Sequence, residues 1–452
     1  MLGILKKSNR YNVNGKNIKF VEFSAKNITA YGGIIFIKEA ITKLNFKELY
    51  SDIFGSRYIG TKYSAYNFII QFIFGIFITG NRIDTIMKLT NSFIIKKILD
   101  CNFTKYCSTF TRFLRRINEN DFNFFKILNE RCLKKILIKF HSLKEETIVV
   151  DGDSTVENIT GKKIENAVKG YNPIKPGSNS YHPIIYFISK FQYIIHGRLR
   201  PGNAYTSDGA EKDIEEIVFK FKNYFKEMIF RFDRGFFSEN IISVIETLKQ
   251  KYIIKVKFKS IYKLLEKAPQ NSYIQSKIDK NIHIAIIEYC LHSWKKARKF
   301  IIVREKKGID ESSIFIHTEY QNIYEYRIYV TNLDMENEEY EIFYNQRANC
   351  EKNICEYKGS FYSGKINTNN FLANSIIFQL HILAYNLFYF FRNNFLPEED
   401  QNHFINEIRL KYLVIGAKLK KYGNSYSILQ FDKYYVFIED IKNIFKNLVL
   451  VT

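Results

Sequence analysis

The spacing of apolar positions changes near residue 147 and divides the chain into two parts. Before this point, apolar residues recur every three or four positions, which predicts mainly helices over residues 1–140 after a short extended start. Beyond it, short β-branched runs alternate with segments of helical spacing. Over residues 147–258 these runs predict, in order, a strand, a strand hairpin that turns near Lys190, a helix, a strand, a helix and a strand.

This order of elements matches a ribonuclease H-like α/β core. Residues 259–340 follow with mostly strand-like segments, which we interpret as a β-strand-rich insertion. A helix over residues 344–358 and a long apolar helix over 369–392 would complete the core, and a basic helix and a final helical segment are expected in the tail. The predicted organisation is an α-helical N-terminal region, the first part of the core, the insertion, the second part of the core and a helical tail, over residues 1–140, 141–258, 259–340, 341–398 and 399–452.

Two strongly apolar stretches need to be distinguished from membrane spans. Residues 67–80 are too short to cross a bilayer. Residues 371–391 are long enough, but they are interrupted by the polar side chains of Asn374, Gln379, His381 and Asn386. We therefore expect both stretches to be buried core helices and the protein to have no membrane partner. The first residues also lack the apolar segment of a signal peptide.

The chain carries a large excess of positive charge. Lys and Arg total 68 against 46 Asp and Glu, which gives a formal net charge of +22. Such a field favours a polyanionic partner, with nucleic acid as the first choice. A compositional bias toward Lys, Asn, Ile, Tyr and Phe accounts for part of the excess, but the acidic residues are not enriched to match. The six cysteines form no CxxC pair and no cluster with His, so we expect free thiols in a reducing cytosol and no zinc site.

A basic amphipathic helix is predicted near residue 112. Ser108 or Thr109 could cap its N-terminus, and its apolar side would consist of Phe110, Phe113, Leu114 and Ile117. The opposite side carries Arg112, Arg115 and Arg116. This pattern fits the last helix of a helix-turn-helix unit with arginines available for DNA, so the N-terminal region is a candidate DNA-binding region. An ordinary amphipathic surface helix fits the pattern equally well.

Acidic residues stand at the ends of two predicted strands and on a later helix. Asp151 and Asp153 end the first strand, Asp233 ends the strand over residues 228–233, and Glu351 lies on the helix after the insertion. The ends of neighbouring strands meet at one edge of a sheet, where sites form. Three carboxylates without His or Cys suit Mg²⁺, and two such ions support phosphodiester chemistry. Asp151 and Asp153 would face the same side, so spacing does not separate them. Each acid taken alone would be interpreted as a turn or helix cap.

The stretch YNQRANCEKNICEYK places Tyr344, Arg347, Glu351 and Lys358 at intervals of three, four and seven residues. At about 100° per residue, all four project from an arc roughly 60° wide on one helix. The alternative is a solvated stripe, in which Arg347 and Glu351 form an ordinary pair worth on the order of a few tenths of a kcal/mol. The acids at the strand ends and the net charge favour a functional face.

These residues resemble the DDE transposases of bacterial insertion sequences, in particular the subgroup with a β-strand insertion before the catalytic Glu. That subgroup has a Y-x(2)-R-x(3)-E-x(6)-K signature, which is complete here over residues 344–358. Within the subgroup, four segments look like the insertion-sequence thirteen-eighty family, namely DGDSTVENITGKK, GYNPIKPGSNSYHP, GRLRPGNAYTSDGA and RFDRGFFSENI. The resemblance covers roughly residues 80–400.

The resemblance implies a role for each matching position. Asp153 would be the first metal ligand, Asp233 would bridge two Mg²⁺ ions, for which Mn²⁺ is expected to substitute, and Glu351 would be the third ligand. Asp151 is the alternative first ligand. DNA phosphates beside the cleaved bond would be held by Tyr344, Arg347 and Lys358. Trp294, in the basic part of the insertion, would stack on a flipped base, with a core tryptophan as the alternative.

The expected function is that of a cut-and-paste transposase acting on double-stranded DNA. The protein would bind the terminal inverted repeats of its element, hydrolyse the phosphodiester at each end and join the freed 3′-hydroxyls to target DNA by transesterification. A homodimer in a synaptic complex is expected, in the bacterial cytoplasm at the nucleoid. Two alternatives stay open, a ribonuclease H-like nuclease without strand transfer and a catalytically silent DNA-binding protein.

Overall fold

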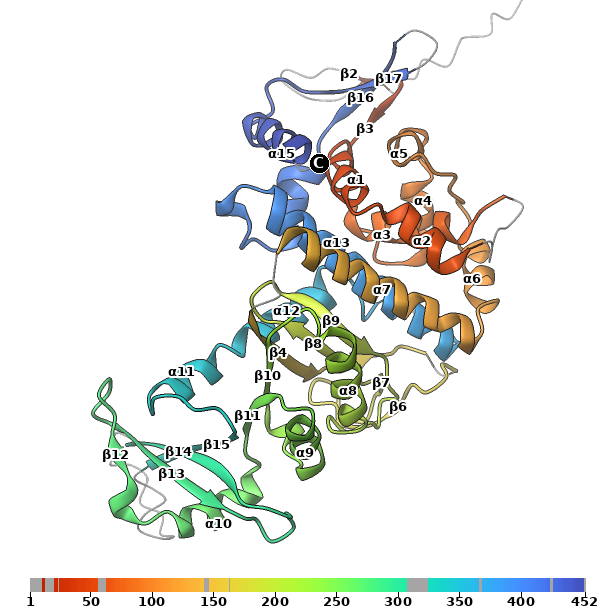
Figure 1. Cartoon of the computed structure of the whole chain (residues 1–452). Helices are drawn as coiled ribbons and strands as arrows, with labels where there is room; N and C mark the ends of the chain where they lie inside the picture. Colours follow the sequence, from red (N-terminus) through yellow and green to blue (C-terminus); the bar gives the residue numbers. More distant parts are fainter. Residues whose placement is uncertain are drawn as a thin grey trace, which may run out of the picture.

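A mixed sheet forms the centre of the fold (Figure 1). The computed structural model describes residues 10–12, 20–22, 24–55, 62–141, 146–161, 163–306, 324–365, 368–422 and 426–450. Within these ranges the sheet has nine strands in the order β12-β13-β14-β15-β11-β10-β4-β8-β9. Its middle consists of three parallel strands, β4 (Thr147–Ser154), β10 (Glu227–Phe232) and β11 (Lys251–Lys255). These strands are rich in β-branched and aromatic residues and are largely buried, as is usual for parallel strands covered by helices.

The elements predicted over residues 147–258 are present in the predicted order. They are completed by the hairpin strands β8 (Ile184–Ile188) and β9 (Tyr193–Arg198) and by the helices α8 (Ala210–Phe221) and α9 (Glu239–Thr247). The Tyr186 hydroxyl donates to Asp213 of α8, which places α8 on the face of the sheet that Tyr186 occupies.

Residues 259–340 extend the same sheet. After α10 (Phe258–Lys267), the strand-like segments form β12 (Ile274–Gln275), β13 (Ile282–Tyr289), β14 (Arg298–Lys306) and β15 (Tyr324–Thr331). β15 runs antiparallel to β11, with Thr331 opposite Ile253. Backbone hydrogen bonds therefore continue from the middle of the sheet into this region, and its described strands belong to the central sheet.

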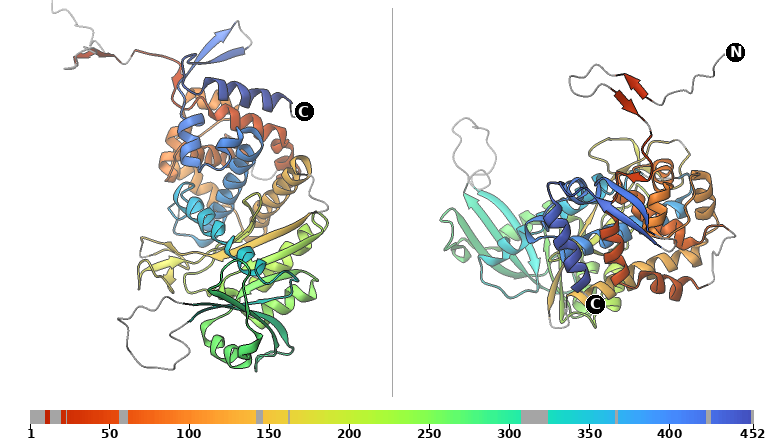
Figure 2. Two further views of the ribbon diagram at one scale, coloured as in Figure 1. Left: turned by 90° about the vertical axis from the view of Figure 1, so that its left-hand side faces the viewer. Right: turned by 90° about the horizontal axis from the view of Figure 1, so that it is seen from above.

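Helices occupy most of residues 34–140, as the apolar spacing predicts. They are α1 (Ile34–Lys43), α2 (Phe46–Phe54), α3 (Ala65–Phe77), α4 (Ile83–Thr90), α5 (Phe93–Leu99), α6 (Cys107–Arg115) and α7 (Glu119–Phe140). Their apolar faces contact one another and the long helix α13 (Phe371–Phe395). Figures 1 and 2 show this helical part stacked on the end of the sheet that carries β9, with α7 and α13 side by side.

The polar residues of α13 explain why so apolar a helix lies inside the protein. The helix is long and apolar enough to cross a membrane, yet 89% of its most apolar window is buried in the fold. Asn386 accepts a hydrogen bond from the N–H of Ile194 (2.8 Å) and donates one to the carbonyl of the same residue (2.8 Å). Gln379 donates to the carbonyl of Gly197 (2.9 Å). Both partners lie on the edge strand β9, whose outer backbone groups need partners when they are buried. The prediction of a core helix is confirmed.

The tail differs from the prediction. A basic helix was expected over residues 403–423, but the helical part ends at Leu413. It is followed by a hairpin of β16 (Ala417–Tyr422) and β17 (Tyr426–Phe431), which pairs with β3 (Ile28–Thr29). The reason lies in the side-chain alternation of β16, where Lys418 and Lys420 are exposed and the Leu419 between them is partly buried. The expected final helix is present as α15 (Ile438–Leu450).

A buried ion pair fixes β4 and β10 relative to each other. Asp151 of β4 lies opposite Arg231 of β10. Arg231 donates from Nε to Oδ1 of Asp151 (2.6 Å) and from Nη2 to Oδ2 (2.8 Å). The two side chains are 1% and 0% exposed. Each charge therefore depends on the other for its compensation.

The same arginine accounts for an unpredicted break in a helix. The single helix expected over residues 344–358 is divided into α11 (Glu339–Asn345) and α12 (Ala348–Gly359), which packs against β4. In a continuous helix the carbonyl of Phe343 would accept from the N–H of Arg347. Here that carbonyl accepts from Arg231, and the Arg347 N–H bonds to the carbonyl of Tyr344 instead.

We predict that Asp151→Ala lowers the free energy of unfolding by about 3–5 kcal/mol, because it leaves the Arg231 guanidinium buried without its carboxylate. Chemical denaturation of the wild type and the variant measures the difference. The matched control is the double variant Asp151→Leu with Arg231→Met, which removes both charges and should cost less than Asp151→Ala alone. A loss below about 1 kcal/mol for Asp151→Ala would contradict the structural role of this pair.

Candidate functional site

Two carboxylates lie side by side where β4 and β10 end. The parallel register places Phe232 beside Gly152, so the following positions bring Asp233 beside Asp153. Asp153 belongs to β4, and Asp233 is the first residue after β10. The structure thus brings together two of the three acids that the sequence singled out.

Backbone N–H groups orient both carboxylates. The N–H of Ser154 donates to Oδ1 of Asp153 (2.7 Å), and the N–H of Gly235 donates to Oδ1 of Asp233 (2.8 Å). Asp233 caps the short 3-10 turn over Arg234–Phe236. A Cβ atom at position 235 would lie 2.9 Å from Oδ1 of Asp233, so glycine is needed for this close approach. Each carboxylate keeps its second oxygen available for another partner.

Arg347 occupies the space between Asp153 and the third acid. Its Nη1 donates to Oδ2 of Asp153 (3.1 Å), and its Nη2 donates to Oε1 of Glu351 (2.9 Å). Burial raises the pKa of Asp153 to about 6; Arg347 opposes this rise, and the neighbouring Asp233 adds to it. Burial alone would lower the pKa of Arg347, but the nearby carboxylates outweigh this effect and raise it above its usual value. The guanidinium therefore serves as the counter-charge of this site.

The donor set suits a hard divalent cation, because it consists of carboxylates without His or Cys. Among the described residues, however, no three acidic, His or Cys side chains converge closely enough to hold a metal ion. Glu351 is 64% exposed and turned toward Arg347. A cation shared by all three carboxylates would therefore require Arg347 to release at least one of them.

Asp151 is not part of this site, although it faces the same side of the sheet as Asp153. Its carboxylate is fully engaged by Arg231 beneath the surface. This pairing favours Asp153 over the alternative first ligand Asp151, and the distinction depends on a partner 80 residues away in the sequence.

Of the other two residues of the signature, Tyr344 is buried and Lys358 is partly buried. Tyr344 contacts the ring of Tyr329, with centroids 4.6 Å apart. Lys358 donates to Oγ1 of Thr155 (2.9 Å) and to the carbonyl of Val156 (2.6 Å), which anchors the chain just beyond β4. Burial lowers the pKa of Lys358. These contacts differ from the solvated stripe considered in the sequence analysis. They also differ from four side chains exposed on one face of a single helix.

Trp294 packs within the folded region beyond β13. Its ring lies 5.3 Å from that of Phe237 and 5.7 Å from that of Phe300, and the Arg298 guanidinium lies 4.8 Å from its centroid. These contacts favour the alternative of a core tryptophan over a base-stacking platform.

The helix α6 has the predicted amphipathic character. Phe110, Phe113 and Leu114 are buried, whereas the exposed residues include Arg112, Arg115 and Arg116. The N-cap is Tyr106, so the expected caps Ser108 and Thr109 lie inside the helix.

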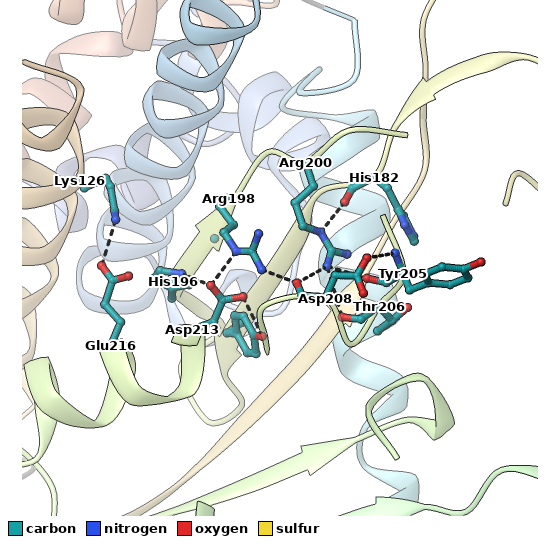
Figure 3. Close-up of polar contacts among 12 residues, drawn as sticks. Lys126, His182, His196, Arg198, Arg200, Tyr205, Thr206, Asp208, Asp213 and Glu216 are labelled. Atoms are coloured by element: carbon teal, nitrogen blue, oxygen red, sulfur yellow. Dashed lines mark hydrogen bonds and ion pairs between the residues drawn. The ribbon is translucent and has the colours of Figure 1, made fainter. Parts of the chain in front are cut away.

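Sequence reasoning did not find a network of polar residues on β9, α8 and the loop between them. Arg198 donates to Oδ1 of Asp213 (2.7 Å), and His196 lies 3.2 Å from the same oxygen (Figure 3). Burial alone would raise the pKa of Asp213, but these two partners hold it below its usual value. The available signal was the clustering of charged and ionisable residues over residues 196–213, namely His196, Arg198, Arg200, Asp208 and Asp213.

A family model described as transposase DDE domain, group 1, matches residues 11–451. The chain matches no curated protein sequence. A solved synaptic complex of piggyBac transposase with hairpin DNA is similar at 13% identity over 84% of this chain and 79% of that chain, with a TM-score of 0.45. A Mos1 transposase paired-end complex with the left transposon end is similar at 15% identity over 35% of this chain and 52% of that chain, with a TM-score of 0.17.

We predict that Asp153→Asn changes the pH dependence of stability. Burial raises the pKa of Asp153 in the folded state from its usual value of 3.8 to about 6, so wild-type stability falls as pH rises through this window. The variant has no ionisable group at this position and lacks this loss. The free energy of unfolding of the variant relative to the wild type should therefore be roughly 2–3 kcal/mol higher at pH 7 than at pH 4. Denaturation curves between these pH values measure the difference, with the exposed Asp52→Asn as control. Parallel stability profiles for wild type and Asp153→Asn would contradict the raised pKa.

Proposed function

This chain belongs to the transposase DDE domain family, group 1, and is a DNA transposase; from this premise we propose that Asp153, Asp233 and Glu351 are its catalytic metal ligands. The observation that supports the assignment is the meeting of Asp153 and Asp233 at adjacent strand ends, with Glu351 linked to Asp153 through Arg347. Two like charges in a partly buried position need a cation beside them.

We propose Mg²⁺ as the physiological cation, with Mn²⁺ as a substitute. Two bound ions would activate a water molecule or a 3′-hydroxyl and stabilise the departing oxygen. The second oxygen of Asp233 and the Asp153 oxygen that Arg347 now contacts would bind them, and Glu351 would turn inward from its exposed position.

Arg347 would then exchange its carboxylate partners for a DNA phosphate. An arginine forms strong charge-assisted bonds with either anion, so the same side chain can neutralise the empty site and hold the substrate. Lys358 would contact a DNA phosphate and also hold the chain beyond β4 in place. Tyr344 would support the start of α12 from its buried position.

The finer classification is also a proposal. The signature at residues 344–358 and the four segments quoted above support the insertion-sequence thirteen-eighty family. The order β4, β8, β9, α8, β10, α9, β11 supports a ribonuclease H-like core, with residues 259–340 as an insertion that prolongs its sheet.

The partners follow from the cut-and-paste reaction. The protein would bind terminal inverted repeats and target DNA as a homodimer in a synaptic complex, in the bacterial cytoplasm at the nucleoid. The exposed Arg112 and Arg115 of α6, together with its C-cap residue Arg116, support DNA contacts from the N-terminal region.

The test is cleavage of a labelled duplex that carries the terminal repeat flanking the protein's own coding sequence, with Mg²⁺. Asp153→Asn, Asp233→Asn and Glu351→Gln should each reduce the rate by roughly 100-fold or more, since even residues that support metal ligands contribute 10–100-fold. Glu48→Gln, an exposed acid on α2, is the control and should cut normally. DNA binding in a gel-shift assay should persist in all four variants.

Other outcomes separate the alternatives. Cleavage without joining of a pre-cleaved end to target DNA would indicate a nuclease. Binding without any cleavage by the wild type would indicate a silent DNA-binding protein. Full activity of any of the three acid variants would contradict its role as a metal ligand.

A further inference from the structure

We propose that Thr206 is a positioning residue that sets the separation of Asp153 and Asp233, and that Arg200 holds the Thr206 loop in place for this purpose. The loop comprises residues 204–209, between β9 and α8. The inference rests on the proposed metal site, and it assigns a role to a segment that touches no catalytic oxygen in the structure.

Thr206 contacts both acid-bearing strand ends. Its Oγ1 is hydrogen bonded to Oγ of Ser154 (2.8 Å), the residue whose N–H orients Asp153. A Cβ atom at Gly235 would lie 2.9 Å from the Thr206 side chain, and the Gly235 N–H orients Asp233. The threonine therefore lies between the two backbone donors that aim the carboxylates.

Arg200 fixes the loop through its carbonyl groups. Its side chain is 2% exposed. Nε donates to the carbonyl of His182 (2.8 Å), and Nη1 donates to that of Tyr205 (2.9 Å), with longer bonds to the carbonyls of Thr206 (3.3 Å) and Asp208 (3.2 Å). Figure 3 shows the guanidinium pointing into the loop. The Arg200 guanidinium thus binds several backbone carbonyl groups of this loop at once.

Neighbouring groups restrict the loop further. Arg198 donates to the Asp208 carbonyl (2.6 Å), and Oδ2 of Asp208 accepts from the N–H of Tyr205 (2.8 Å). Gly209 has a φ of +70°, and a Cβ atom there would lie 2.7 Å from Nη2 of Arg198. These contacts leave the loop little freedom to move Thr206 away from the strand ends.

Burying Arg200 is costly, which indicates that the loop conformation is under constraint. Burial lowers its pKa to about 10, and its Nη2 lies buried without a hydrogen-bond partner among the described residues. A simple surface turn would not need a buried guanidinium. A turn that must hold two carboxylates at a metal-binding separation would benefit from one, because such sites tolerate only small displacements.

The test is Mn²⁺ affinity, measured from the electron paramagnetic resonance signal of free Mn²⁺ during titration of the protein bound to a terminal-repeat duplex, which gives Arg347 a phosphate partner, with the duplex alone as the blank. Thr206→Val, which keeps the shape and removes the hydroxyl, should weaken Mn²⁺ binding by roughly 10-fold. Thr206→Ser should restore binding. Ser207→Ala, in the same loop, is the matched control and should bind as the wild type does. Arg200→Lys should weaken binding as well, and thermal unfolding reports separately whether each variant is folded.

The outcomes distinguish this inference from the metal site on which it rests. If Asp153→Asn loses Mn²⁺ binding while folded Thr206→Val and Arg200→Lys bind as the wild type does, the positioning role is wrong and the metal site stands. If the wild type binds no Mn²⁺, the proposed metal site fails and this inference fails with it.

Discussion

Two carboxylates at the ends of adjacent parallel strands repel each other, and the local structure is arranged around that repulsion. Burial raises the pKa of Asp153 and the nearby Asp233 adds to the effect, so the pair is stable as two anions only beside a positive charge. In the structure that charge is the Arg347 guanidinium, which also reaches Glu351. Because these carboxylates need a nearby positive charge, a divalent cation can take the place of the Arg347 guanidinium if Arg347 moves away.

The placement of Arg347 depends on a second, deeper arginine. Arg231 is paired with Asp151 and takes the carbonyl of Phe343, which interrupts the helix just before Arg347. The break lets Arg347 begin α12 beside the strand ends. The buried pair therefore links the register of β4 and β10 to the position of the helix that carries Glu351. A loss of activity on mutation of Asp151 would consequently report on folding, and it must be interpreted together with stability.

Local patterns in the sequence were sufficient for the strand ends and for the buried helices, because both follow from short-range periodicity. The order of elements over residues 147–258 and the meeting of Asp153 with Asp233 could be predicted in this way. The choice between Asp151 and Asp153 could not, because both face one side and only Arg231, on another strand, separates them. The division of the helix over 344–358 depends on the same distant side chain. The tail differs from the predicted helix because Lys418 and Lys420 face solvent while Leu419 between them is partly buried, an alternation of period two that forms a strand.

The central claim is that the three acids form one metal site from which Arg347 is displaced. A crystal structure of the protein with Mn²⁺ and a DNA duplex, with anomalous scattering recorded at the manganese edge, tests it most directly. We expect manganese peaks within coordination distance of Asp153, Asp233 and Glu351, and the Arg347 guanidinium on a DNA phosphate. Manganese bound elsewhere, or Arg347 still bridging Asp153 and Glu351 beside bound ions, would contradict the account.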